Sequence, residues 1–437
     1  MDENKMKVEL SSESQHARGY SFATVALPTG KALLRDAEQR ARWGVYSDAM
    51  EIIKVLSCPW APELCDLRLD VPTLDELNYL AKRLSDLSQE EQTVYRALCQ
   101  RRFGDGTGIE PVSVEELINM TFDLDQVPIA SNIQTDAELG TFVMENDLHP
   151  DVAAIPEESL YLLDRARIGA LQREQMGGLF LNGLYIEAGN YVLPKVYQSV
   201  ERPVDEPEDR AVFRLQIARS SDRGWDQPEE SLEWIELPVS QEEAVMIAHR
   251  HHELCVEECM LFAVESAIPQ IGMETIRDLS DFRQLNELAE QYLQMSETDQ
   301  IKFKAVLQRN GVYDLSDALY QMENLQQYEF IRTVPDEAVF FKEYLAHHLG
   351  QDFDRRWLDT LPDGTEGYHL LERLGAKMTE YGIVSAPGVS LFQAVSFEPL
   401  RNQALTGQDA AEETGLALHG DAAAPELAEL TMGGMQL

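Results

Sequence analysis

Histidine and cysteine side chains gather in one short stretch of the chain, at His249, His251, His252, Cys255 and Cys259. We expect this stretch to be helical, so that His251, Cys255 and Cys259, four residues apart, share one helix face. Imidazole and thiolate groups at that spacing can bind zinc or another soft metal. The first half of the chain has no equivalent cluster, and no second ligand pair is evident. The sequence therefore favours packing and solvation of that face, and we expect no metal and no cofactor.

Groups that could carry catalysis are not singled out by their spacing. Acid–base catalysis needs two carboxyl groups at a defined separation, and 77 acidic residues offer many pairs without marking one. The glycine-rich segment 104–108 lacks the lysine and the strand-to-helix context of a phosphate-binding loop, so it predicts a turn. Neither GxSxG nor HExxH occurs. We therefore expect a protein that is not an enzyme.

The clearest concentration of one chemical group is acidic. From Phe103 to Asp164 the chain has 62 residues without Lys or Arg, and 14 of them are acidic. Apolar residues such as Leu117 and Leu139 are interleaved with the acids, which predicts a folded segment with one acidic face. The predicted partner-binding carboxylates are Asp105, Glu110, Glu115, Glu116, Asp123, Asp125, Asp136, Glu138, Glu145, Asp147, Asp151, Glu157, Glu158 and Asp164.

The expected spacing of these carboxylates resembles that of DNA phosphates. Acids three or four residues apart on a helix lie about 5–6 Å from each other, and B-DNA carries one charge per about 1.7 Å of its axis over two strands. A rigid fold with carboxylates several ångströms apart presents a similar field to a protein that grips phosphates. The alternative interpretation is an ordinary solvated surface.

The charge of the whole chain points the same way. Its 437 residues include 77 acidic and 36 basic ones, for a net charge of −41. Such a surface repels nucleic acid and anionic membranes and attracts basic proteins. The five cysteines include no pair of CxxC motifs, no stretch has 18 consecutive uncharged apolar residues, and the N-terminus lacks the apolar core of a signal peptide. We expect a cytoplasmic protein that does not bind nucleic acid or membranes directly.

An internal repeat divides the chain into two acidic modules. Residues 77–81 recur at 285–289 with an offset of 208, and Asp123 corresponds to Asn324 at 201. Further on, Gly183 is predicted to match Gly388 at 205, and Gly169 to match Gly375 at 206. The predicted organisation is module 1 at 5–199, a charged linker at 200–210, module 2 at 211–395 and a disordered tail at 396–437.

Each module is predicted to be α+β. Helices are expected over 74–84, from Ser88 onwards, over 113–121 and 136–146, and over 241–252 with Ser240 as its N-cap. A strand is expected at 212–217. The segment Leu179–Ile186 predicts a hairpin with Asn182–Gly183 as its turn.

Several of these residues resemble the ArdA antirestriction family. In the first module the resemblance lies in Leu74-Asp75-Glu76-Leu77-Asn78-Tyr79-Leu80, Leu87-Ser88-Gln89-Glu90-Glu91 and Gly178-Leu179-Phe180. It also lies in the stretch from Glu145 to Gly169, at Leu148, Pro156, Tyr161, Leu163-Asp164 and Ile168-Gly169. In the second module it is weaker and lies in Leu349, Leu371 and Leu374-Gly375. It covers most of both modules. The family tends to place Arg after the glycine of its motif, whereas Ala170 and Ala376 follow Gly169 and Gly375 here.

The resemblance implies an elongated α+β fold that mimics bent B-form DNA. It implies inhibition of Type I restriction–modification enzymes and a setting in mobile genetic elements, as a counter-defence. Family members typically dimerise, so a fused pair can do the work of a dimer, and further homodimerisation stays open. The alternatives are an inhibitor of a CRISPR nuclease and, from another class, an acidic scaffold or adaptor without mimicry. The partner expected for a mimic is the basic DNA-binding groove of a defence enzyme.

Overall fold

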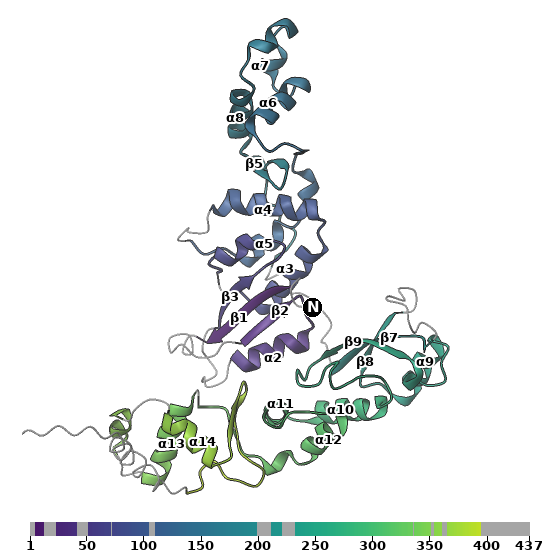
Figure 1. The fold of residues 1–437 in the computed structure, drawn as a ribbon, viewed down its shortest axis with the longest axis vertical. Helices are drawn as coiled ribbons and strands as arrows, with labels where there is room; N and C mark the ends of the chain where they lie inside the picture. The colour runs from purple at the N-terminus through teal and green to yellow at the C-terminus, as the bar shows by residue number, and fades with distance from the viewer. Residues whose placement is uncertain are drawn as a thin grey trace, which may run out of the picture. The chain divides into compact units, whose positions relative to one another are not determined.

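The computed structural model has an α+β fold (Figure 1). It describes residues 5–12, 23–41, 51–70, 72–104, 110–198, 211–220, 232–334, 336–350, 354–360 and 365–394. The linker expected at 200–210 and the tail expected at 396–437 both lie outside these ranges.

The first half alternates short strands with helices. Its elements are β1 (Met6–Ser12), β2 (Ala23–Leu27), α2 (Lys31–Ala41), β3 (Glu51–Ser57), the 3-10 helix η2 (Pro62–Asp66), α3 (Leu74–Asp86), α4 (Gln89–Phe103), α5 (Val114–Asn119), η3 (Leu124–Gln126), β4 (Ile129–Ser131), α6 (Asp136–Glu145), α7 (Pro150–Ala153), η4 (Glu157–Leu162), α8 (Arg165–Met176), β5 (Gly178–Leu181) and β6 (Leu184–Glu187).

The second half repeats nearly the same order. Its elements are β7 (Phe213–Ala218), β8 (Glu233–Leu237), α9 (Gln241–Arg250), η6 (Val256–Glu258), β9 (Met260–Ser266), α10 (Phe282–Gln294), α11 (Glu297–Asn310), α12 (Leu315–Glu323), η7 (Leu325–Gln327), β10 (Phe330–Ile331), α13 (Glu337–Leu349), η8 (Arg355–Thr360), α14 (Thr365–Arg373), β11 (Lys377–Thr379) and β12 (Gly382–Val384).

The sheets of the two halves have matching topologies. Each half begins with an antiparallel sheet whose first strand is central, in the orders β2-β1-β3 and β8-β7-β9. Each half ends with a second antiparallel sheet, in the orders β4-β6-β5 and β10-β12-β11. The predicted hairpin is confirmed as β5 and β6, and both Asn182 and Gly183 have the positive φ that a two-residue hairpin turn favours.

Each half buries its own apolar core. One cluster of buried side chains extends from Met6 to Tyr197 and another from Val212 to Val384. In α3 the buried leucines recur every three or four residues, which is the spacing of one helix face. Asn78 on α3 accepts a hydrogen bond from the Thr29 amide and donates one to the Thr29 carbonyl. Asn286 makes the same pair with Val239, so an equivalent bond ties each helix to the loop after its second strand.

Capping boxes begin several of the predicted helices. Ser88 begins α4 and Ser240 begins α9, and each hydroxyl accepts a hydrogen bond from the amide three residues later. The prediction that the second of these helices reaches residue 252 is wrong. Helix α9 ends at Arg250, because buried His251 bonds to Glu233 and His252 adopts a φ of 60°.

Two glycines let α6 and α8 approach very closely. A Cβ atom on Gly140 would lie 1.8 Å from the Arg165 carbonyl oxygen, and one on Gly169 would lie 1.8 Å from the Asp136 carbonyl oxygen. In the second half, a Cβ on Gly367 would lie 2.1 Å from a carbonyl oxygen of α13. Both helix pairs therefore depend on glycine at their crossing.

The structure confirms two of the predicted repeat offsets and corrects the others. Helices α3 and α10 begin 208 residues apart, and β4 and β10 begin 201 apart, as predicted. After these elements the offset is 198. Gly169 and Gly367 lie at equivalent helix crossings, α6 with α8 and α13 with α14. Gly177 and Gly375 follow α8 and α14, with φ values of 57° and 58°. The predicted match of Gly183 with position 388 is therefore wrong. The change falls near α7, which the described part of the second half lacks.

Candidate partner-binding face

The predicted acidic segment folds into α5, η3, β4, α6, α7 and η4 and ends at the N-cap of α8 (Figure 1). Most of its described carboxylates are exposed, namely Glu110, Asp123, Asp125, Glu138, Glu145, Asp147, Asp151 and Asp164. Glu115, Glu116 and Asp136 are half-buried. Asp105 lies outside the described residues, and Glu157 and Glu158 are placed by the backbone of η4.

Some of these carboxylates hold the local structure. Glu138 accepts hydrogen bonds from the backbone amides of Gln134 and Thr135, at 2.8 and 3.0 Å, in the capping box of α6. These hydrogen bonds hold its pKa below the ordinary value for glutamate. Asp164 caps α8 through the Arg167 amide at 3.2 Å. Both are surface groups with a structural role.

The segment has no Lys or Arg of its own, but two cations from the flanking helices neutralise part of it. Arg102, on α4, pairs with Glu116. Arg173, on α8, forms a two-bond contact with Asp136, with N–O distances of 2.8 and 3.2 Å. Both arginines lie outside residues 103–164 and reach the segment through the packing of α4 and α8.

Five of the exposed carboxylates accept no capping hydrogen bond and pair with no basic side chain among the residues that the structure describes, whereas Glu138 and Asp164 cap helices and Asp151 lies beside His149. Within the described ranges, no Lys or Arg forms a salt bridge with Glu110, Asp123, Asp125, Glu145 or Asp147. We call these five residues the open acidic set. They lie on or beside helices and strands of the folded segment, and their charges are available to solvent or to a binding partner.

The histidine and cysteine cluster does not lie on one helix. His249 is on α9, Cys255 precedes the 3-10 helix η6, and Cys259 follows it. His251 Nε2 lies 3.0 Å from a Glu233 carboxylate oxygen, which already satisfies it. In the part of the chain that the structure describes, no three His, Cys, Asp or Glu side chains are placed to hold one metal ion.

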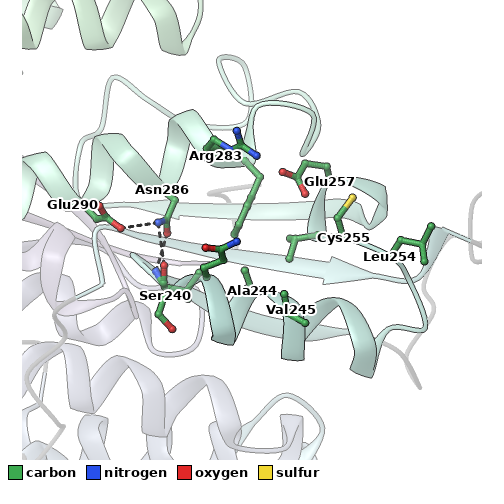
Figure 2. Close-up of a pocket in the computed structure, with 13 residues that line it drawn as sticks. Ser240, Ala244, Val245, Leu254, Cys255, Glu257, Arg283, Asn286 and Glu290 are labelled. Carbon is green, nitrogen blue, oxygen red and sulfur yellow. Dashed lines mark hydrogen bonds between the residues drawn. The ribbon is translucent and has the colours of Figure 1, made fainter.

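A pocket of about 590 Å³ lies beside this region, between α9, α10 and residues 254–257 (Figure 2). Val245, Leu254, Cys255, Arg283 and Glu257 are among its lining residues. Burial and the nearby Glu257 carboxylate raise the pKa of the Cys255 thiol, so the thiol is not activated as a nucleophile. The pocket therefore offers a mixed apolar and polar surface and no nucleophile–base pair.

Asn286 at the edge of the pocket is occupied by structural bonds. Its amide donates to the Val239 carbonyl at 3.1 Å and to Glu290 at 3.0 Å (Figure 2). These bonds fix α10 against the loop before α9 and leave that amide little freedom to bind a ligand.

Comparisons with known proteins assign no family. No protein-family model, no curated protein and no solved structure matches this chain. No helix within the described ranges is long and apolar enough to cross a lipid bilayer.

A buried charged cluster that joins the two halves was not predicted from the sequence. Asp36 and Lys304 lie fully inside the protein, 268 positions apart, and contact each other. One signal was present in the sequence, because Lys304 lies between apolar Phe303 and Ala305, and the repeat places Met246 opposite Asp36 at an offset of 210.

Proposed function

We propose that this chain is a non-catalytic DNA mimic, as its resemblance to the ArdA family implies. Its carboxylates occupy the DNA-binding groove of a Type I restriction–modification enzyme or a similar DNA-handling defence enzyme. The observation that carries the proposal is the open acidic set, a group of exposed carboxylates on an ordered frame without basic neighbours in salt-bridge contact. The net charge of −41 supports it, because a basic groove attracts such a surface from a distance.

The repeated fold supports a partner that is itself extended. Each half has the same two sheet topologies, and both halves are acidic, with 30 acidic and 18 basic residues at 5–199 and 33 and 15 at 211–395. A fused pair offers two acidic surfaces on one chain. This arrangement suits a groove that holds a long duplex better than a small acidic binding site.

The direct test is inhibition of a purified Type I enzyme in a DNA-cleavage assay. The chain should inhibit cleavage in proportion to its concentration, and raising the DNA concentration should relieve the inhibition. Variants with neutralised tail acids serve as a control for bulk charge. Full cleavage at a large excess of the chain over the enzyme would contradict the proposal for this enzyme class.

An acidic adaptor is the second candidate, and one observation favours it. Val245 and Met246 are half-exposed and Leu254 is 90% exposed, beside the pocket of the second half. An apolar surface of this kind is typical of a protein-binding site. Removing it by Leu254→Ser should leave DNA-competitive inhibition unchanged if the chain is a mimic, and should abolish partner binding if the chain is an adaptor.

A further inference from the structure

Asp36, on α2, is completely buried, and its partners come from both halves of the chain. Its carboxylate accepts hydrogen bonds from Lys304 Nζ on α11 at 2.7 Å and from Tyr381 Oη, between β11 and β12, at 2.9 Å. Arg40, one turn later on α2, donates to the same carboxylate at 2.9 Å. A buried carboxylate needs such partners, because an uncompensated charge is costly away from water.

The repeat shows that the second half is what buries Asp36. The matching position on α9 is Met246, at an offset of 210, and it is 54% exposed. The next residues, Ala37 and Ile247, are both buried in their own halves. The two helices therefore sit alike on their own sheets, and only α2 has its outer face covered by the other half.

Lys304 depends on this contact for its counter-ion. The matching residue of the first half is Arg96, at an offset of 208, and it bonds to Glu63 of its own half at 3.1 Å. The turn from Ala61 to Leu64 matches residues 268–271 at an offset of 207, with the same backbone hydrogen bond and the same buried ends, so the neutral Gln270 stands where the first half has Glu63. Among the described residues, Lys304 therefore has no carboxylate partner from its own half, and Asp36 of the first half supplies one.

Further contacts between the two halves lie next to Asp36 on α2. Lys304 also donates to the Gln39 side chain at 3.1 Å, and Arg332 donates to the Gln39 backbone carbonyl. Burial lowers the pKa of Lys304, and the Asp36 carboxylate opposes that shift. The ammonium group is thus held in a place that would favour its neutral form if Asp36 were absent.

We propose that α2 and the surface formed by α11, β11 and β12 are a charge-selective dock between unlike halves. The first half presents the Asp36 carboxylate, and Arg96, its own counterpart of Lys304, is already paired with Glu63. The second half presents Lys304, which Met246 of another second half cannot satisfy. The dock therefore joins a first half to a second half and disfavours contact between two like halves. This inference does not depend on the proposed function.

The test uses the full chain with a protease recognition sequence placed at residues 203–208. After cleavage the two halves should stay together in size-exclusion chromatography. Asp36→Lys brings two cations together and should weaken the association by about 100-fold or more. Adding Lys304→Glu to that variant should restore it. The matched control is Met246→Lys, which places the same charge at the equivalent exposed position and should have no effect.

Three results would overturn the proposal. These are prompt separation of the unsubstituted halves after cleavage, equal behaviour of Asp36→Lys and Met246→Lys, and failure of the paired Asp36→Lys and Lys304→Glu exchange to restore association. Circular dichroism of each uncleaved chain checks folding. If Asp36→Lys alone does not fold, recovery of folding and association in the paired exchange still supports the dock, and no recovery refutes it.

Discussion

Neutralising the open acidic set should reduce binding to a DNA-gripping enzyme while leaving the fold intact. The change is the replacement of Glu110, Asp123, Asp125, Glu145 and Asp147 by their amides. An exposed ion pair contributes about 0–1 kcal/mol, so five of them contribute about 2–3 kcal/mol. That loss corresponds to a weakening of about 30- to 150-fold. Binding is measured by titrating the labelled chain with the enzyme.

The structure determines which acids belong in this variant. Glu116 and Glu138 are left unchanged, because they pair with Arg102 and cap α6. Asp123 and Asp147 have φ values of 54° and 51°, a region that asparagine tolerates well, so the amide suits both positions. The thermal unfolding midpoint should therefore stay unchanged or rise, since repulsion between like charges is relieved.

A matched variant separates a shaped face from bulk charge. It neutralises the same number of acids in the tail, at Asp409, Glu412, Glu413, Glu426 and Glu429. Its binding should change much less. Equal losses from the two variants would show that bulk charge, and not a shaped acidic face, produces the binding. Loss of all activity from one single substitution would point to a catalytic carboxylate instead.

Two further predictions concern stability. Gly140→Ala places a methyl group against the Arg165 carbonyl, so it should destabilise the packing of α6 on α8 by about 3 kcal/mol. The measurement is backbone hydrogen exchange, which should become faster in these two helices only. Unchanged exchange would contradict the close crossing. Burial raises the pKa of Glu63, but hydrogen bonds from Arg96 and Gln100 outweigh it and leave the pKa below 4.5. The resulting stability is present above the unfolded pKa and is lost as the pH falls through the folded value. Glu63→Gln should therefore lower the free energy of unfolding at pH 7, measured in urea, by about 1–3 kcal/mol. The difference from the unsubstituted protein should shrink below about pH 4.5. A difference that stays constant with pH would contradict this role of Glu63.

Local signals in the sequence predicted the elements well. Ser88 and Ser240 with acids three residues later mark helix starts, and Asn182–Gly183 marks a hairpin, because each signal acts within one turn of chain. The last repeat offset was wrong because glycines at 183 and 388 look alike in sequence, whereas the strand register distinguishes them.

Contacts between distant segments were not predictable in the same way. The acidic segment contains no Lys or Arg, yet Arg102 and Arg173 from the flanking helices pair with it. A window of sequence does not show which cations fold onto it. Likewise Asp36 looks like an ordinary helix-surface acid, and only its contact with Lys304, from the other half, makes it a core residue.

The most direct test of DNA mimicry is competition for the DNA-binding groove of a Type I enzyme. Binding of the chain to the purified enzyme is followed at rising salt and with increasing unlabelled duplex DNA. DNA mimicry predicts that the affinity falls steeply with salt and that duplex DNA displaces the chain from the same site. Binding that is insensitive to both salt and duplex DNA would contradict DNA mimicry.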